Sequence, residues 1–239
     1  RPTGPLRPQA RSVRSSPGGK KAENDILYEE NFHEDKKAKG WMTITLELVP
    51  EDLCARYEVR EWRHAAAILA GDFPDEWSDI REVLREFKLC KSFIDTGGGR
   101  KSKVSESIDS AFYARGWTEK SFSTAIVVDG STSDSPTHAI DCYKNGVGLE
   151  IEWNNKDPFF DRDLNNFRLL FDLRVVSVGV IVTRCDSLQG IFERLGRGKS
   201  YGASTTHMGK LLPKIDGGGG GGCPILVFGI KDVLYDENC

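Results

Sequence analysis

The stretch at residues 175–182 constrains the fold most, because it is almost continuous valine and isoleucine. An apolar run of this length is typical of a β-strand that is covered on both faces. A second run of the same character lies at residues 224–230. Two such strands need helices on either side of their sheet. The sequence therefore predicts an α/β fold, with a central mixed β-sheet flanked by helices.

The size and composition suit an ordinary globular domain. The chain has 239 residues, of which 38% are hydrophobic, so wholesale disorder is excluded. No apolar run approaches the length of a membrane-spanning helix, and no apolar segment follows the basic N-terminus as in a secretory signal. The formal net charge of −3 argues against sequence-blind coating of nucleic acid. We expect a cytoplasmic protein with no membrane partner.

Residues 1–41 differ from the rest of the chain. The first twenty residues hold five basic residues, four prolines and no acid, a composition typical of disorder. The first methionine is Met42. We interpret residues 1–41 as a disordered or non-native extension and residues 42–239 as a single domain, whose net charge is then −6. The alternative is a basic arm that grips DNA phosphates.

Periodicity and turn signals predict the remaining elements. The predicted strands lie at residues 55–62, 123–129, 137–143, 147–153, 175–182 and 224–230. The predicted helices lie at residues 75–89, 104–115, 157–173, 187–195 and 208–215, and the third of these should bury Phe160, Leu164, Phe167 and Phe171. We expect loops at residues 95–103, 130–136 and 197–207.

The pair Asn145-Gly146 is the strongest hairpin signal in the chain. A two-residue turn there places Asp141 directly opposite Glu150, and alternation places Glu152 on the same face. The other face would carry Ile140, Cys142, Leu149, Ile151 and Trp153, which are all apolar. Like charges on neighbouring strands destabilise a sheet unless they are solvated or share a cation. The hairpin thus indicates either a Mg²⁺ site or the polar outer face of an antiparallel sheet.

The order of motifs resembles that of the BglII/BstYI type of restriction endonuclease. The resemblance covers about residues 57–230 and rests on Asp141 followed by Glu150-Ile151-Glu152, with supporting segments. These segments are Lys103-Val104, Ala114-Arg115-Gly116-Trp117, Asp157-Pro158-Phe159 and the strands 178–183 and 224–230. The resemblance implies a restriction-endonuclease-like fold with an active-site β-hairpin.

The resemblance also implies a Mg²⁺-dependent homodimer that cuts a short palindrome in double-stranded DNA, with Mn²⁺ able to substitute. Asp141 and Glu150 would bind the metal, and Ile151 would offer its backbone carbonyl. Glu152 would orient or activate the attacking water. The family is expected to carry Gln there, so Glu152 departs from the pattern, and its role as a general base or a second-metal ligand stays open.

Two loops are candidates for reading the DNA sequence, and a third for holding its phosphates. The candidate DNA-binding residues are Asn154, Asn155, Lys156, Ser204, Thr205, Thr206, Arg100, Lys101 and Lys103. The alternatives are a helix start for 155–157, an ordinary turn for 204–206 and a solvated loop for 100–103. Glu119 and Glu106 are candidates for a fourth active-site carboxylate, although either suits a plain surface position.

Three further features predict no additional chemistry. The six cysteines have no CxxC spacing, and we expect free thiols in a reducing compartment, with a disulfide framework or a zinc site as the alternative. The six glycines at residues 217–222 lack the GKS or GKT sequence of a phosphate loop, so no nucleotide cofactor is expected. His138 should pack on the apolar face by alternation rather than take part in catalysis.

Two other functions remain to be separated from a restriction endonuclease. One is another nuclease of the same superfamily that acts in DNA repair or recombination and shares the carboxylates but lacks the recognition loops. The other is a non-catalytic DNA-binding module that uses the hairpin only as a scaffold. Metal binding distinguishes the DNA-binding module from a nuclease, because only a nuclease should bind Mg²⁺ or Mn²⁺ and lose that binding when Asp141 is replaced.

Overall fold

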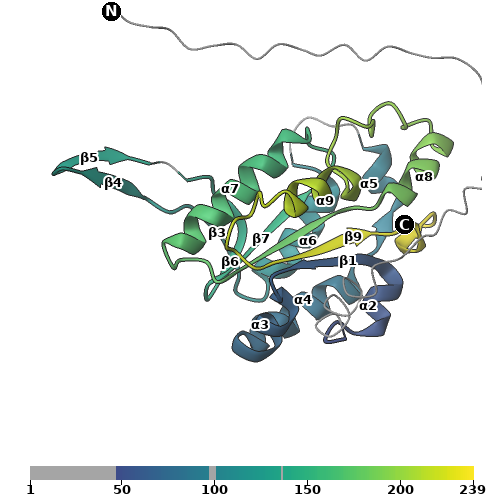
Figure 1. The fold of residues 1–239 in the computed structure, drawn as a ribbon. Helices are drawn as coiled ribbons and strands as arrows, with labels where there is room; N and C mark the ends of the chain where they lie inside the picture. Colours follow the sequence, from purple (N-terminus) through teal and green to yellow (C-terminus); the bar gives the residue numbers. More distant parts are fainter. Residues whose placement is uncertain (1–46, 97–100, 136) are drawn as a thin grey trace, which may run out of the picture. The chain divides into compact units, whose positions relative to one another are not determined.

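A computed structural model describes residues 47–96, 101–135 and 137–239. Residues 1–41, interpreted above as an extension, lie outside this range, as does Arg100. The chain builds a six-stranded mixed sheet with helices on both faces (Figure 1). In sheet order the strands are β1 (Tyr57–Trp62), β9 (Ile225–Ile230), β8 (Val178–Arg184), β7 (Val147–Glu152), β6 (Ile140–Lys144) and β3 (Thr118–Lys120). Strands β9, β8 and β7 run parallel, and the outer pairs are antiparallel.

The helices divide between the two faces of this sheet, so the predicted α/β class is confirmed (Figure 1). One face is covered by α7 (Pro158–Asp172) and α9 (Met208–Asp216). The helices that pack into the core of the other face are α2 (Glu51–Arg56), α3 (Ala65–Asp72), α4 (Pro74–Glu86), α5 (Lys91–Asp95), α6 (Lys103–Tyr113) and α8 (Gln189–Arg194). The 3₁₀ turns η1 (Asp186–Leu188) and η2 (Asp232–Leu234) complete the helical segments.

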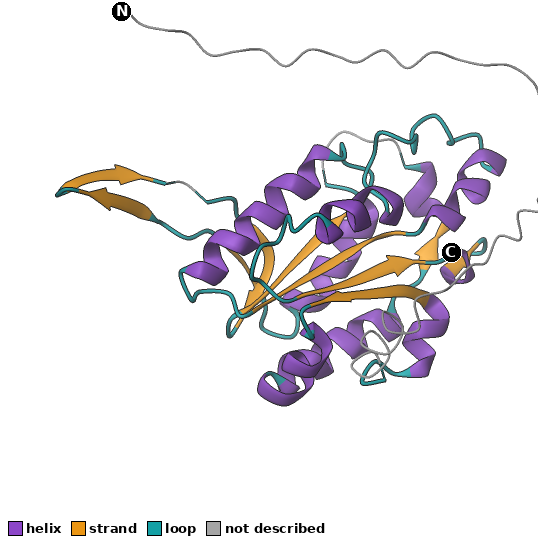
Figure 2. Ribbon diagram, in the orientation of Figure 1, coloured by secondary structure: helices purple, strands orange, loops and turns teal. Residues whose placement is uncertain are grey.

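Two small two-stranded sheets lie outside the main one. Strands β4 (Ala125–Val128) and β5 (Ser131–Asp134) form a hairpin (Figure 2). Every residue of these two strands is exposed. Residues 131–134, which fall in the loop that we predicted at 130–136, therefore form a strand, and Pro136 lies outside the described residues. The turn residues Asp129 and Gly130 both have positive φ, the conformation of a two-residue hairpin turn, which the Asp-Gly pair itself signals. The second small sheet pairs β2 (Leu89–Cys90) with β10 (Tyr235–Asp236).

A disulfide joins Cys90 to Cys239 beside this second small sheet. The expectation that all six cysteines are free is therefore wrong for this pair. Spacing along the chain gave no hint of it, because the two residues are 149 positions apart and meet only through the fold. The other four cysteines are free, and Cys142, Cys185 and Cys223 are buried.

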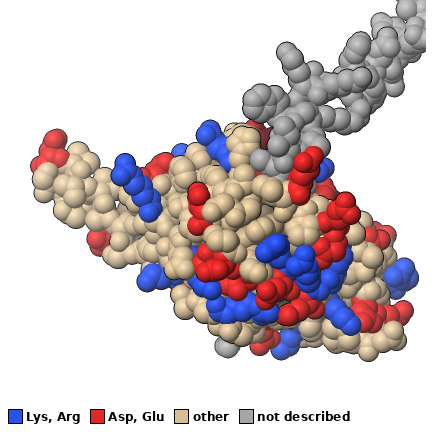
Figure 3. Space-filling view, turned by 90° about the horizontal axis from the view of Figure 1, so that it is seen from below, with Lys and Arg blue, Asp and Glu red and all other residues tan. Residues whose placement is uncertain are grey.

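Charges of both signs mix over the helical surface. On the face shown in Figure 3, blue and red side chains are interspersed, and no single basic field covers it. Ion pairs account for part of this mixture: Arg85 lies 2.6 Å from Asp52, and Arg115 lies 2.9 Å from Glu86. Neutralised patches of this kind do not form a broad surface for the DNA backbone.

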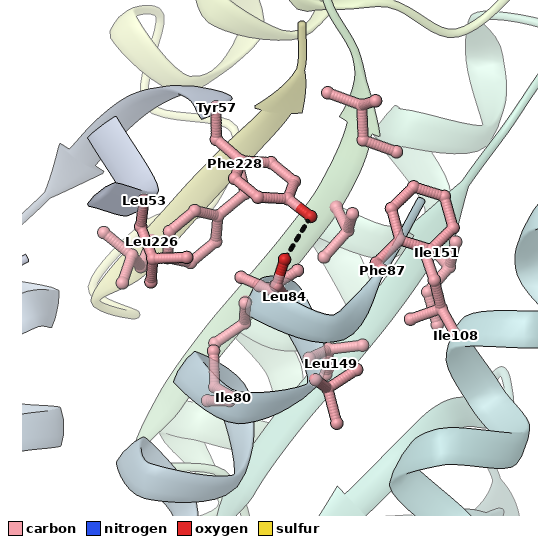
Figure 4. Close-up of a cluster of buried hydrophobic side chains, with 14 of the residues drawn as sticks. Leu53, Tyr57, Ile80, Leu84, Phe87, Ile108, Leu149, Ile151, Leu226 and Phe228 are labelled. Atoms are coloured by element: carbon pink, nitrogen blue, oxygen red, sulfur yellow. Dashed lines mark hydrogen bonds between the residues drawn. The ribbon is translucent and has the colours of Figure 1, made fainter. Parts of the chain in front are cut away.

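The core follows the alternation of the central strands. Leu149, Ile151 and Phe228 point into the larger cluster, where α4 contributes Ile80 and Leu84 (Figure 4). The hydroxyl of Tyr57 donates to the carbonyl of Leu84 at 2.8 Å, which satisfies a buried polar group (Figure 4). On the opposite face, Phe160, Leu164 and Phe167 of α7 are buried as predicted, whereas Phe171 is half-buried.

The helix and strand limits differ from the predicted ones at several ends. Residues 55–56 belong to α2 rather than to the first strand, and residues 137–139 precede β6 instead of joining it. This second shift explains two wrong side-chain assignments. Ile140 packs in the α7 cluster and not with Cys142, and His138 is exposed rather than packed. The alternation of side chains between the two faces of a strand does not hold for residues at or before the start of that strand.

Candidate active site

The β6–β7 hairpin brings two carboxylates together, as the turn arithmetic predicts. Cys142 pairs with Leu149, so Asp141 and Glu150 are the next residues opposite each other. The amide of Asp141 donates to Glu150 Oε2 at 3.3 Å, and the amide of Ile151 donates to Asp141 Oδ2 at 3.0 Å. Asn145 and Gly146 have φ of 48° and 90°, which the turn requires and which fixes this register.

Glu152 lies at the carboxyl end of β7, and both of its oxygens have partners. Asn155 Nδ2 donates to Oε2 at 2.7 Å, and Arg162 Nη2 donates to Oε1 at 3.2 Å. Only 2% of Glu152 is exposed, so these two donors replace water for a side chain that is otherwise enclosed. Arg162 comes from α7, which the Asp157-Pro158 pair starts at the predicted place.

Two further acids that we did not predict lie beside the hairpin. Asp163 of α7 is fully buried and accepts from Arg162 Nε at 2.9 Å. Asp109 of α6 is also buried, forms an ion pair with Lys101 and lies 3.5 Å from Cys142 Sγ. Glu119 and Glu106, which we considered as the fourth carboxylate, are both exposed residues at the rim of the site.

A signal for the two buried acids is present in the sequence. Asp163 falls between Phe160 and Leu164 in the apolar stripe of α7, at a position that faces the sheet. Asp109 likewise falls between Ile108 and Phe112 in the stripe of α6. An acid within an apolar helix face is unusual and marks a buried charge with a partner.

Burial controls the electrostatics of the site. It raises the pKa of Glu150 well above its usual range, and the nearby charges of Asp163 and Asp141 raise it further. Burial and Asp163 raise the pKa of Glu152 to about 9. Burial also raises the pKa of Asp163, and it raises that of Asp109 to about 6 against the opposing effect of Lys101. These four buried acids therefore have fewer cations beside them than they would need to be ionised together.

Two of these carboxylates, Asp141 and Glu152, line a cleft of about 760 Å³, whereas Glu150, Asp163 and Asp109 lie behind its wall. Its walls include Asp141, Ile151 and Glu152 from the hairpin, and Phe159 and Arg162 from the start of α7. His138 also lines the cleft. This position differs from our prediction that His138 packs in the core. The rest of the lining comes from the start of α6 and from Phe93, Thr96, Glu119, residues 153–155, Arg197, Ser200 and Tyr201. Polar and charged groups thus surround an open space beside the β7 carboxyl end.

The donor set fits a hard divalent cation, although it is not a ready-made metal site. Among the residues that the structure describes, no three His, Cys, Asp or Glu side chains are arranged to hold a metal. Glu150 Oε1 is nonetheless buried with no hydrogen-bond partner in the described part of the chain. A buried carboxylate oxygen needs a proton or a cation, and Mg²⁺ prefers oxygen ligands. Asp141, Glu150 and the Ile151 carbonyl are the groups that would hold it.

The two candidate recognition loops lie side by side. Lys156 pairs with Thr205 in an antiparallel bridge, and the amide of Thr206 donates to the carbonyl of Asn155 at 2.8 Å. Lys156 and Ser204 are exposed, and Asn154 is half-buried. Thr205 and Thr206 are buried, with 7% and 0% exposed. Their hydroxyls are used inside the protein, so Ser204 is the residue of the 204–206 segment that is available to DNA.

The basic loop is only partly described. Lys101 and Lys103 lie at the cleft, where Lys101 pairs with Asp109 and Lys103 with Glu106. The pair with Glu106 is exposed on both sides, at 52% and 56% of the side chains. Exposed pairs contribute little to stability, so a phosphate can compete for Lys103. Arg100 lies outside the described residues.

The fold and the site together define a class of protein. A mixed sheet, with helices on both faces and an acidic hairpin beside an open cleft, is the arrangement of the restriction-endonuclease-like nucleases. The family model for the restriction endonucleases BglII and BglIII matches residues 57–230, which is more than half of the chain and runs from the start of β1 to the end of β9. The chain belongs to this family, and it is a type II site-specific deoxyribonuclease. No curated protein matches it.

No helix among the described residues is both long and apolar enough to cross a membrane.

Proposed function

We propose that this protein is a Mg²⁺-dependent homodimer that hydrolyses one phosphodiester bond in each strand of a short palindromic site in double-stranded DNA. Residues 42–239 would form the single endonuclease domain, and Mn²⁺ would substitute for Mg²⁺. The observation that carries the metal dependence is Glu150 Oε1, which has no hydrogen-bond partner among the described residues and lies within a buried acidic cluster. A two-fold dimer follows from the palindrome, because symmetric half-sites need symmetric subunits.

The residues of the cluster would have different roles in metal binding and proton transfer. Asp141, Glu150 and the Ile151 carbonyl would hold the cation. When bound, Mg²⁺ supplies positive charge that acidifies a water molecule and offsets the charge of the phosphate. Glu152 would accept the proton of the attacking water, whose oxygen forms a bond to phosphorus as the bond to the 3′ oxygen breaks. A pKa of about 9 leaves Glu152 protonated at neutral pH, so it would take this role only once a bound cation lowers that pKa.

Polar residues from three segments of the chain would hold the DNA. Lys103, with Arg100 and Lys101, would contact phosphates, whereas Asn154, Lys156 and Ser204 would reach base edges. Amide and ammonium groups can pair with adenine and guanine in the major groove. We place the enzyme in the cytoplasm with its DNA substrate. The Cys90–Cys239 disulfide counts against that location, because such bonds are rare in reducing compartments.

The test is a digestion of phage DNA by the unmutated protein and by Asp141→Ala, each with Mg²⁺ and with EDTA. The proposal predicts discrete fragments from the unmutated protein with Mg²⁺ only, and their ends would give the recognition site. Smears or end-trimming would indicate a repair or recombination nuclease instead. Intact DNA, bound equally by both proteins, would indicate a non-catalytic DNA-binding module.

A further inference from the structure

The loop that follows the catalytic strand is held by the second recognition loop through three hydrogen bonds. Two are the backbone bonds that form the Lys156–Thr205 bridge: the amide of Asp157 donates to the carbonyl of Ser204 at 3.1 Å, and the amide of Thr206 donates to the carbonyl of Asn155 at 2.8 Å. In the third, the amide of Asn155 donates to Thr206 Oγ1 at 3.1 Å. The backbone position of Asn155 is therefore set by Thr206.

The side chain of Asn155 points back into the active site. Its amide nitrogen lies 2.7 Å from Glu152 Oε2, a short distance that fits a bond to a buried acid. Arg162 holds the other oxygen at 3.2 Å. Bidentate pairing with adenine would need both the oxygen and the nitrogen of the amide. Because that nitrogen is engaged by Glu152, the geometry does not suit Asn155 as a base reader.

The second loop is in turn anchored to the sheet. Arg184, at the end of β8, is 2% exposed and donates to Thr205 Oγ1 at 2.8 Å and to the carbonyl of Tyr201 at 3.0 Å. The neighbouring Thr183 donates to the carbonyl of Glu152 at 2.8 Å. Ser204 alone of the 204–206 segment is exposed, so a contact between DNA and this segment would fall on Ser204, next to the buried Thr205 and Thr206.

We propose that Asn155 is a positioning residue that couples recognition to catalysis. It connects the 204–206 segment to Glu152, so that the seating of this segment on DNA sets the orientation of the carboxylate that receives the proton. The inference rests on the proposed function, because it assigns Asn155 a part in the same hydrolysis. Partners that orient catalytic groups typically contribute 10- to 100-fold to activity.

The test compares Asn155→Ala and Thr206→Val with the unmutated protein on a duplex that carries the cleavage site. Each variant should lower kcat at saturating DNA by about 10- to 100-fold. The affinity for the same duplex, measured in EDTA, should stay within about twofold of the unmutated protein, because neither lost group touches DNA. Since Thr206 is 0% exposed, an effect of its hydroxyl on kcat cannot come from base contact.

Three controls separate positioning from misfolding. Thr206→Ser keeps the hydroxyl and should recover most of the rate. Asn165→Ala removes an exposed asparagine of α7 outside the cleft and should leave the rate unchanged. The double variant Asn155→Ala with Thr206→Val should lose little more than either single variant, because both break one connection. Thermal unfolding of every variant checks that the fold is intact.

The outcomes that would overturn the inference are specific. An unchanged kcat for Thr206→Val would show that the 204–206 segment does not position Glu152. Asn155→Ala with an unchanged kcat but relaxed specificity at one base pair would make Asn155 a base reader. An unmutated protein that does not cleave would instead overturn the proposed function, and this inference with it.

Discussion

At the scale of single residues, the buried carboxylates of the site lower the free energy of unfolding. Glu150, Glu152 and Asp163 are each at most 2% exposed and lie close enough that their charges disfavour one another. Arg162 is the cation that pairs with two of them. Ionised carboxylates in such a place are unfavourable until a proton or a metal joins them. The same arrangement that weakens the fold prepares it to take up a divalent cation.

This arrangement predicts how stability depends on pH. The pKa of Glu152 is about 9 in the folded protein, and an unfolded glutamate has a pKa of about 4.3. Between these values the folded protein keeps a proton that the unfolded chain has lost. The free energy of unfolding should therefore fall as the pH rises from about 5 to about 9. Thermal unfolding in EDTA should show a lower Tm at pH 8.5 than at pH 6.

The matched variant for this measurement is Glu152→Gln, which has the same shape and no proton to lose. Its Tm should change less between pH 6 and pH 8.5 than that of the unmutated protein. A Tm that rises with pH in EDTA, or a slope that Glu152→Gln leaves unchanged, would contradict the assignment of this pKa.

The site residues differ in how far sequence could predict them. Asp141 and Glu150 were predictable because a two-residue turn fixes which residues face each other. Asp109 and Asp163 were missed, although each stands in an apolar helix stripe. The engagement of Asn155 with Glu152 had no local signal, because it depends on where Thr206 holds the loop.

At the scale of elements, prediction succeeded where local chemistry decides the structure. The Asn145-Gly146 hairpin and the Pro158 helix start are local features, and both are found. Strand β3 was missed because its three residues are polar and exposed, and only pairing with β6 makes them a strand. Helix α3 was missed as well, since its alanine-rich sequence carries no amphipathic pattern.

The packing of α7 on the sheet depends on a glycine in β8. A Cβ atom added at Gly179 would lie 2.7 Å from Phe167 Cδ2, so the ring can approach the strand only because no side chain is there. Gly179→Ala should lower the free energy of unfolding by about 1–3 kcal/mol through overpacking. Because α7 carries Arg162, cleavage should slow as well.

The control for this substitution is Gly190→Ala in α8, where an added Cβ meets no atom within 4 Å. That variant should be neutral or more stable by up to about 1 kcal/mol, as expected for alanine in a helix. Unfolding in urea measures the free energy of unfolding of both variants. Equal stability of the two variants would show that Phe167 can move away at no cost.

At the scale of the whole molecule, the disulfide closes a long section of the chain. Cys90 precedes α5, whose Phe93 lines the cleft, and Cys239 follows β10. Cross-linking residues 149 positions apart restricts the unfolded chain, so loss of the bond should lower the free energy of unfolding by about 2–4 kcal/mol.

Cys239→Ser tests this contribution by denaturant unfolding. Dithiothreitol should destabilise the unmutated protein to the level of the variant and leave the variant itself unchanged. An unmutated protein that responds no more than Cys239→Ser would show that the bond does not form in solution.

The central claim is that the acidic hairpin hydrolyses DNA through a cation that it binds. Cleavage of DNA by Glu150→Gln, measured with Mn²⁺ and with EDTA beside the unmutated protein, tests it most directly, because glutamine keeps the shape but removes the charge and replaces one carboxylate oxygen with an amide nitrogen. The account predicts a loss of cleavage of about 1,000-fold or more. It also predicts that in EDTA the variant unfolds at a Tm no lower than that of the unmutated protein. Metal-dependent cleavage by Glu150→Gln at the unmutated rate would contradict the claim.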